Sequence, residues 1–131
     1  MSSYPQFSEL TALYVEDEPV ARLSIGTFLK RQLGELHLAE NGKEGFELFE
    51  SHRPQVVITD LEMPVMNGME MIRRIRELDN GTPIIITTAY DDGEHRCEQA
   101  DRVILKPIIF NDLLKVINEC IEKRQTKSKG C

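Results

Sequence analysis

Short apolar runs rich in β-branched residues alternate along this chain with stretches that have the period of an amphipathic helix. Several runs are almost continuously apolar, which is typical of strands buried on both faces of a sheet. The five runs cover residues 10–15, 36–39, 56–59, 84–88 and 103–105. Strands separated by helices indicate βαβ units, and therefore predict a parallel sheet with right-handed crossovers and helices on both faces.

Four stripes of apolar or small residues have the spacing of helices that pack on such a sheet. They are Ala21/Ile25/Phe28/Leu29, Gly42/Gly45/Phe46/Phe49, Met71/Ile75/Leu78 and Leu113/Leu114/Ile117/Ile121. The two glycines of the second stripe predict a helix that lies close to the sheet. A further helix is expected in residues 91–101, which are polar and contain glycine, so we expect it to be shortened. The sequence thus predicts an α/β fold with five strands and five helices.

Length and composition restrict the class of protein. A chain of 131 residues allows one ordinary domain, and its 40% hydrophobic and 29% charged residues are typical of a soluble globular protein. The net charge of −6 argues against nonspecific nucleic-acid binding, because a polyanion requires a basic face. The sequence shows neither a bilayer-spanning run nor a signal peptide. Its three widely spaced cysteines suit neither a disulfide framework nor a zinc site, so we expect a cytoplasmic protein.

Polar side chains gather where the predicted strands end. In an open parallel sheet, ligands bind beyond the carboxyl ends of the strands. Five side chains are expected at that edge: Glu16, Asp17, Asp60, Thr88 and Lys106. One carboxylate after a strand is usually a helix cap or a solvated loop residue, and one Lys-Pro pair is usually a turn. The convergence of all five residues is what indicates a site.

Three crowded carboxylates repel one another, and this raises their pKa values unless a cation neutralises them. Oxygen ligands without nearby cysteine or histidine favour Mg²⁺. Such a metal would place a phosphoryl donor beside a carboxylate nucleophile, and carboxylates do form aspartyl phosphates. Lys106 would pair with the phosphoryl oxygens, and Thr88 would donate a hydrogen bond to one of them.

With these residues in place, the chain resembles a response-regulator receiver domain of two-component signalling, with a fold like that of the chemotaxis regulators. The matching segments are residues 14–19, 58–70, 86–90 and 104–107. The resemblance covers residues 8–122 and implies a flavodoxin-like, doubly wound parallel sheet with strand order 2-1-3-4-5. Residues 123–131 carry four basic and no acidic side chains, and we expect a solvated tail or a truncated linker there.

The resemblance implies a role for each residue of the site. Asp60 would be the phosphoacceptor, and Lys106 would contact the phosphoryl group. Glu16, Asp17 and Asp60 would hold Mg²⁺, with the backbone carbonyl of Glu62 as a further ligand. The donor would be a phosphohistidine on a sensor histidine kinase or a histidine phosphotransfer protein. The domain would be a signalling switch rather than a turnover enzyme, with self-catalysed phosphorylation and slow autodephosphorylation.

The resemblance also implies a switch segment and an output surface. Thr88 would be the switch hydroxyl, followed by Ala89 and by Tyr90, which is either a gate over the site or a loop residue. Members of the family often carry an aromatic residue three positions before the lysine, where this chain has Val103. We therefore expect the conformational change that follows phosphorylation to stay local or to reach the output surface by another route. A downstream effector protein or domain, or a second copy in a homodimer, would bind at the output surface. We expect this domain to make no direct contact with nucleic acid or membrane.

Two alternative functions stay open at this stage. A degenerate receiver would act as a protein-binding module that is independent of phosphorylation, although Asp60, Thr88 and Lys106 are all present. An Mg²⁺-dependent phosphatase with an aspartate nucleophile typically carries Asp-x-Asp on its first strand. Here the candidate nucleophile follows the third predicted strand, as Asp60-Leu61-Glu62, and the sequence shows no apparent substrate cap.

Overall fold

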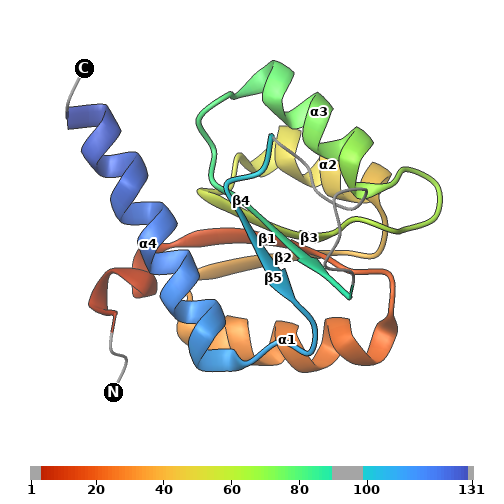
Figure 1. Cartoon of the computed structure of the whole chain (residues 1–131), viewed down its shortest axis with the longest axis horizontal. Helices are drawn as coiled ribbons and strands as arrows, with labels where there is room; N and C mark the ends of the chain where they lie inside the picture. The colour runs from red at the N-terminus through yellow and green to blue at the C-terminus, as the bar shows by residue number, and fades with distance from the viewer. Residues whose placement is uncertain (1–3, 90–98, 130–131) are drawn as a thin grey trace.

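The computed structural model describes residues 4–89 and 99–129, with side chains as far as residue 124. A five-stranded parallel sheet forms the middle layer of the molecule (Figure 1). Its strands are β1 (Thr11–Val15), β2 (Glu35–Ala39), β3 (Val56–Asp60), β4 (Ile84–Thr88) and β5 (Arg102–Leu105). Their order is β2-β1-β3-β4-β5, and every neighbouring pair is parallel. The doubly wound sheet with order 2-1-3-4-5 is therefore confirmed.

Helices cover both faces of this sheet. The helices α1 (Pro19–Gln32) and α4 (Phe110–Lys129) lie on one face, and α2 (Gly42–His52) and α3 (Gly68–Leu78) lie on the other (Figure 1). The shortened helix expected in residues 91–101 falls largely on residues 90–98, which lie outside the described residues. The last helix, α4, continues through the basic segment from Lys123 as far as Lys129.

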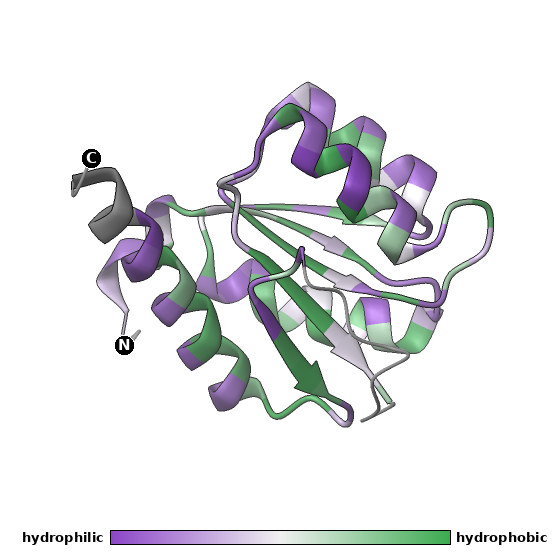
Figure 2. Cartoon of the chain, turned by 45° about the horizontal axis from the view of Figure 1, so that its top comes forward, coloured by the Kyte–Doolittle hydropathy of each residue, from purple (hydrophilic) through white to green (hydrophobic). Residues whose placement is uncertain are grey.

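Each face of the sheet has its own hydrophobic core. Along β1, Ala12 and Tyr14 face the core formed with α1 and α4, whereas Leu13 and Val15 face the core formed with α2 and α3. This alternation follows from the period of two in a strand. In Figure 2 the strands are mostly hydrophobic, and α4 shows both hydrophilic and hydrophobic bands. No helix within the described ranges is long and apolar enough to cross a membrane.

The edge strand β5 is less covered than the three central strands. β1, β3 and β4 are almost completely buried, as their continuous apolar runs predict. In β5, Val103 and Leu105 are 44% and 45% exposed, although the segment is equally apolar. Because β5 has a neighbouring strand on one side only, its apolar sequence does not ensure burial.

The two glycines of α2 make different contacts. A Cβ atom on Gly45 would lie 2.7 Å from Sδ of Met71 and 2.9 Å from a methyl group of Val15, so α2 does approach the sheet there. Gly42 packs instead against the loop before α3, where its backbone N–H donates to the carbonyl oxygen of Met66 over 2.9 Å. The expected close packing on the sheet thus holds for Gly45 and not for Gly42.

Side-chain caps fix the loops at the carboxyl edge of the sheet. The Glu18 carboxylate accepts hydrogen bonds from the first turn of α1, with Pro19 as the first residue of that helix. Asn41 and Asn67 cap α2 and α3 in the same way. Such caps satisfy backbone N–H groups that have no partner within the helix. They therefore hold the segments that follow β1, β2 and β3 in defined positions.

A short 3-10 helix, η1 (Pro5–Glu9), precedes the first strand. Its Phe7 side chain is fully buried in the core shared with α1 and α4, and it stacks on Tyr4 with ring centroids 4.9 Å apart. The apolar pattern of residues 1–9 gives little sign of this helix, because one buried phenylalanine does not establish a period. η1 is therefore an element of the fold that the sequence did not predict.

Candidate functional site

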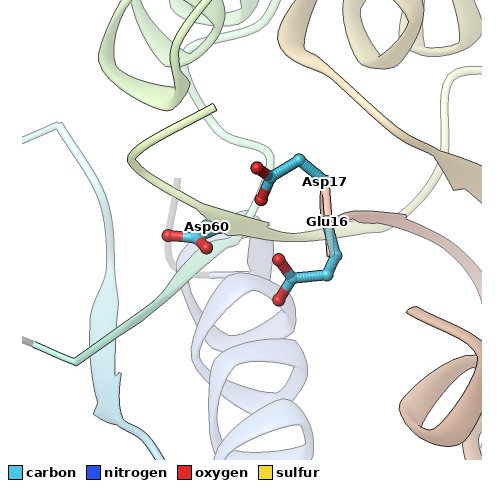
Figure 3. Close-up of side chains that lie close together, drawn as sticks. All are labelled: Glu16, Asp17 and Asp60. Carbon is cyan, nitrogen blue, oxygen red and sulfur yellow. The ribbon is translucent and has the colours of Figure 1, made fainter. Parts of the chain in front are cut away.

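Three carboxylates meet at the carboxyl edge of the sheet. Glu16 and Asp17 directly follow β1, and Asp60 is the last residue of β3. β1 and β3 are neighbours, with Val15 aligned with Thr59, so their ends lie side by side. Each of the three carboxylates offers an oxygen within 4.8 Å of the others. Figure 3 shows these carboxylates gathered around one shared space.

Lys106 joins this cluster from the end of β5. Its Nζ atom lies 3.0 Å from Oδ2 of Asp60 and 3.1 Å from Oε1 of Glu16. Partial burial lowers the pKa of Lys106, but its hydrogen bonds to Asp60 and Glu16 outweigh this effect and raise the pKa above the usual value. The side chain is therefore a full ammonium at neutral pH, and it offsets one of the three negative charges.

Glu16 is the most buried member of the cluster, with 1% of its side chain exposed. Burial raises the pKa of Glu16, because desolvation disfavours its charged form, and the ammonium of Lys106 offsets part of this rise. Its second carboxylate oxygen accepts a hydrogen bond from the backbone N–H of Glu18 over 3.3 Å. Both oxygens of Glu16 are thus held in place.

The Asp60 carboxylate is oriented and still reachable from solvent. Its Oδ1 atom accepts hydrogen bonds from the backbone N–H groups of Leu61 over 2.7 Å and Glu62 over 3.3 Å. Its side chain is 14% exposed, in contrast to the buried Glu16. A carboxylate that is fixed at one oxygen and faces an ammonium at the other is placed to act as a nucleophile toward a phosphoryl group.

Two of the expected switch residues, Thr88 and Val103, lie on β4 and β5, the two strands beyond Asp60. Thr88 ends β4 and is 2% exposed, and its carbonyl oxygen accepts a hydrogen bond from the backbone N–H of Lys106 over 2.7 Å. Ala89 is exposed. Val103 lies on β5 opposite Ile86, two residues back from the pair formed by Thr88 and Leu105, so it is not part of the cluster. Tyr90 lies outside the described residues.

Two further residues contact the cluster from the α1 side of the sheet. The Arg22 guanidinium donates hydrogen bonds to the carbonyl oxygens of Glu16 and Asp17. The Tyr14 side chain is fully buried, and burial together with the negative charges of Glu16 and Asp60 raises its pKa. Sequence reasoning did not single out Arg22, because an arginine on an outer helix usually belongs to the solvated face. The available signal was the sequence position of Arg22, which lies one turn into the helix that follows the acidic pair.

The donor set fits a small divalent cation. Three carboxylates and one ammonium leave a net charge of about −2, which a divalent cation would balance. All three ligands are hard oxygen donors, which suit Mg²⁺ better than a softer metal. Exposed acidic groups are common without a metal, but here one carboxylate is buried and another is half-buried. The residues of the cluster can therefore hold Mg²⁺ next to the Asp60 carboxylate.

A doubly wound parallel sheet that carries this acidic cluster and lysine at its carboxyl edge is the fold of a signalling receiver domain. The chain belongs to the response regulator receiver domain family, whose family model matches residues 12–118.

Known proteins support this membership. The chain is 32% identical to the regulatory protein AtoC of Escherichia coli over 89% of its length, and 32% identical to the response regulator MprA of Mycolicibacterium vanbaalenii over 90%. It spans only 26% of AtoC and 52% of MprA. A crystal structure of a CheY-like response regulator receiver domain protein from Methanospirillum hungatei matches with a TM-score of 0.85 and 25% identity, covering 91% of this chain and 98% of the other.

Proposed function

We propose that this chain is a phosphorylation-dependent receiver, in which Asp60 accepts a phosphoryl group with the help of Mg²⁺. The observation that carries the proposal is the position of Asp60 between a carboxylate cluster and an ammonium, with Lys106 Nζ 3.0 Å from its Oδ2 atom. Family membership supports it, because receiver domains are the signalling partners of sensor kinases. The proposed receiver unit is residues 8–122, to which Phe7 and the later turns of α4 add packing and length.

Each residue has a separate task in the proposed reaction. Glu16, Asp17, Asp60 and the backbone carbonyl of Glu62 would hold Mg²⁺, which supplies positive charge for the phosphoryl oxygens when bound. Lys106, which contacts both Asp60 and Glu16, would provide a second positive charge for the phosphoryl group. Protein residues thus supply position and charge, which is most of what phosphoryl transfer requires.

The proposed transfer exchanges one bond to phosphorus for another and needs no oxidant. A carboxylate oxygen of Asp60 forms a bond to phosphorus, and the bond between phosphorus and the donor nitrogen of a phosphohistidine breaks. The electron pair of that bond returns to the imidazole ring, which takes up a proton from water. Hydrolysis later returns Asp60 as a carboxylate and releases inorganic phosphate. Because the chain is regenerated only slowly, it acts as a switch rather than as a turnover enzyme.

The proposed switch begins at Thr88. In this proposal its hydroxyl donates a hydrogen bond to the phosphoryl group on Asp60, and this biases the segment that includes Ala89 and Tyr90 toward a second arrangement. Val103 has no aromatic ring that could flip and is 44% exposed, so in this proposal the change stays local or reaches the outer surface by another route. A downstream effector, or a second copy of the chain, would read that surface.

Exposed apolar side chains around the site support docking of a donor protein. Val20, Val65 and Ile109 each lie in a segment that follows a strand at the carboxyl edge, and they are 72%, 77% and 60% exposed. In the proposal, a sensor histidine kinase or a histidine phosphotransfer protein covers part of this rim during transfer. Apolar contact next to a reactive carboxylate would exclude water from the transferred group.

Incubation with acetyl phosphate and Mg²⁺ tests the proposal directly. The wild-type protein should gain the mass of one phosphoryl group, and hydroxylamine should remove it, as expected for an acyl phosphate. Asp60→Asn should gain nothing. Beryllofluoride with Mg²⁺ should shift the backbone amide signal of Thr88 in the wild type.

Other outcomes of this experiment would favour the alternatives. A wild type that gains no mass, with or without Mg²⁺, would support a binding module that works without phosphorylation. Many turnovers of a phosphomonoester per protein would support a phosphatase. A phosphoryl gain that survives in Asp60→Asn would contradict the assignment of the phosphoacceptor.

A further inference from the structure

Arg22 lies in the first turn of α1, but its side chain points back to the end of β1. Its Nη1 atom lies 2.7 Å from the carbonyl oxygen of Glu16 and 3.3 Å from the carbonyl oxygen of Asp17. These two residues form the connection between β1 and α1, and both belong to the carboxylate cluster. One guanidinium therefore contacts the backbone of two of the three clustered acids.

The contact restrains the backbone that carries both acid side chains. When a carbonyl oxygen is held toward Arg22, the planar peptide group that contains it cannot rotate freely. The side chains of Glu16 and Asp17 therefore project from a restrained backbone. In the observed arrangement, the carboxylates of Glu16 and Asp17 lie near Asp60 (Figure 3). The Arg22 side chain is 21% exposed, so water competes little for its donors.

The other partner of Arg22 is weaker. Its Nη2 atom lies 3.8 Å from Oε2 of Glu40, whose side chain is 62% exposed. Exposed ion pairs of this kind contribute little to stability. The two backbone contacts, rather than the ion pair, are therefore the main consequence of the position of Arg22.

We propose that Arg22 is a positioning residue for the Mg²⁺ site, because it holds the Glu16 and Asp17 backbone so that both carboxylates face Asp60. The inference rests on the proposed function, since it concerns the same metal site. Arg22 acts through the backbone of the ligands and is not itself a ligand. Groups that orient metal ligands in this way typically change metal affinity by about 10- to 100-fold when they are removed.

Positioning and simple charge effects predict changes of opposite sign. Arg22 carries a positive charge near a site for a divalent cation, so loss of that charge alone should strengthen Mg²⁺ binding. Loss of the two backbone hydrogen bonds should instead weaken binding, because the carboxylates would no longer be held together. The direction of the change therefore separates the two explanations.

The test compares Mg²⁺ affinity of the full chain in the wild type and four variants, by calorimetric titration and by the backbone amide shifts of Asp17 and Asp60. R22M removes the guanidinium and keeps an aliphatic stem, and R22K keeps one charged donor group. R31M removes the same charge from the exposed last turn of α1. E40Q removes the ion pair and leaves the backbone contacts intact.

We expect R22M to bind Mg²⁺ about tenfold more weakly than the wild type, in the range for groups that orient ligands. The Mg²⁺ affinity of R22K should lie between those of R22M and the wild type, because an ammonium does not reproduce the forked donor geometry of a guanidinium. R31M and E40Q should match the wild type, and the amide shifts of Asp17 should be smaller in R22M at saturation.

Several results would overturn the inference. R22M that binds Mg²⁺ as tightly as the wild type, or more tightly, contradicts it, and so does R31M with an equal loss. If circular dichroism shows that R22M does not fold, then R22K decides, and wild-type affinity in R22K contradicts the inference. A wild type that binds no Mg²⁺ would overturn the proposed function itself, whereas equal binding by wild type and Arg22 variants would overturn only the role of Arg22.

Discussion

The Nζ atom of Lys106 lies 3.0 Å from Oδ2 of Asp60, although Asp60 ends β3 and Lys106 follows β5, two strands that are not neighbours in the sheet. β4 lies between β3 and β5, so the lysine side chain must reach across the end of one strand. The same ammonium lies 3.1 Å from the buried Glu16 carboxylate. Lys106 therefore supplies positive charge between two carboxylates that would otherwise repel each other.

Lys106→Met should destabilise the metal-free protein, because it leaves buried Glu16 without its counter-charge. Breaking a fully buried pair costs about 3–5 kcal/mol, and we expect about 1–2 kcal/mol here because the lysine is partly exposed. Added Mg²⁺ should restore most of the loss, since it supplies new positive charge. Urea unfolding with and without Mg²⁺ measures both effects. Lys115→Met, on the exposed side of α4, is the matched control, and an equal loss there would contradict the explanation.

Thr87→Val should stabilise the protein by about 1 kcal/mol, because a buried hydroxyl without a partner costs free energy. Among the described residues, the Thr87 hydroxyl has no hydrogen-bond partner. Thr59→Val is the matched comparison, since the Thr59 hydroxyl donates to the carbonyl oxygen of Asp60 over 2.7 Å. Thr59→Val should lower the free energy of unfolding by about 1 kcal/mol. Free energies of unfolding from urea titrations should therefore change in opposite directions, and a loss in both variants would contradict this account.

Asp79→Asn should flatten the loss of stability at acidic pH. Although partial burial raises the pKa of Asp79, hydrogen bonds from the Gly81 backbone and the Thr82 side chain, together with Arg124, lower it overall. A carboxyl group with a lowered pKa stabilises the folded state above its unfolded pKa of about 3.9, and that contribution is lost as the pH falls through the folded pKa. Urea midpoints between pH 6 and pH 2 should thus fall less steeply in Asp79→Asn than in the wild type.

The Arg124 side chain provides a control for this pH effect. Its Nη2 atom lies 3.6 Å from Oδ2 of Asp79, whereas the Gly81 N–H donates to Oδ1 over 2.8 Å. Arg124→Met should therefore remove only part of the acid dependence. If Asp79→Asn and the wild type showed the same slope below pH 5, the assigned role of Asp79 would be wrong.

Phe7→Ala should cost about 3–5 kcal/mol, the usual range for removing a fully buried aromatic side chain. This prediction tests whether η1 is part of the folded unit, because the family match begins only at residue 12. Thermal and urea unfolding should both show the loss. Ser8→Ala, at an exposed position of the same helix, should leave stability almost unchanged. A Phe7→Ala protein as stable as the wild type would place η1 outside the cooperative unit.

Much of the fold could be predicted because burial and sequence pattern agree in its centre. The strands β1, β3 and β4 are buried on both faces, so their apolar runs are continuous and unambiguous. β5 has an equally apolar sequence, yet Val103 and Leu105 are exposed. Apolar character reports the tendency to be buried, but the place of a strand in the sheet decides how much of it is covered. That place came from family resemblance and not from the residues alone.

The candidate site shows the same division. Parallel strands align their carboxyl ends. The sequence alone could therefore predict that one edge of the sheet holds Glu16, Asp17, Asp60 and Lys106. It could not show that Lys106 bridges Asp60 and Glu16, since the reach of a side chain across β4 depends on strand order. Arg22 was missed for a related reason. Its partners are backbone carbonyl oxygens, and any residue type can supply those.

The most direct test of the central claim is to trap the acyl phosphate chemically and locate it in the chain. The protein would be phosphorylated with acetyl phosphate and Mg²⁺ and then treated with borohydride, which reduces an aspartyl phosphate to homoserine. Peptide mass spectrometry would then identify the modified position. The account predicts homoserine at position 60, dependent on both acetyl phosphate and Mg²⁺. Homoserine at position 17 with an unmodified Asp60 would contradict it.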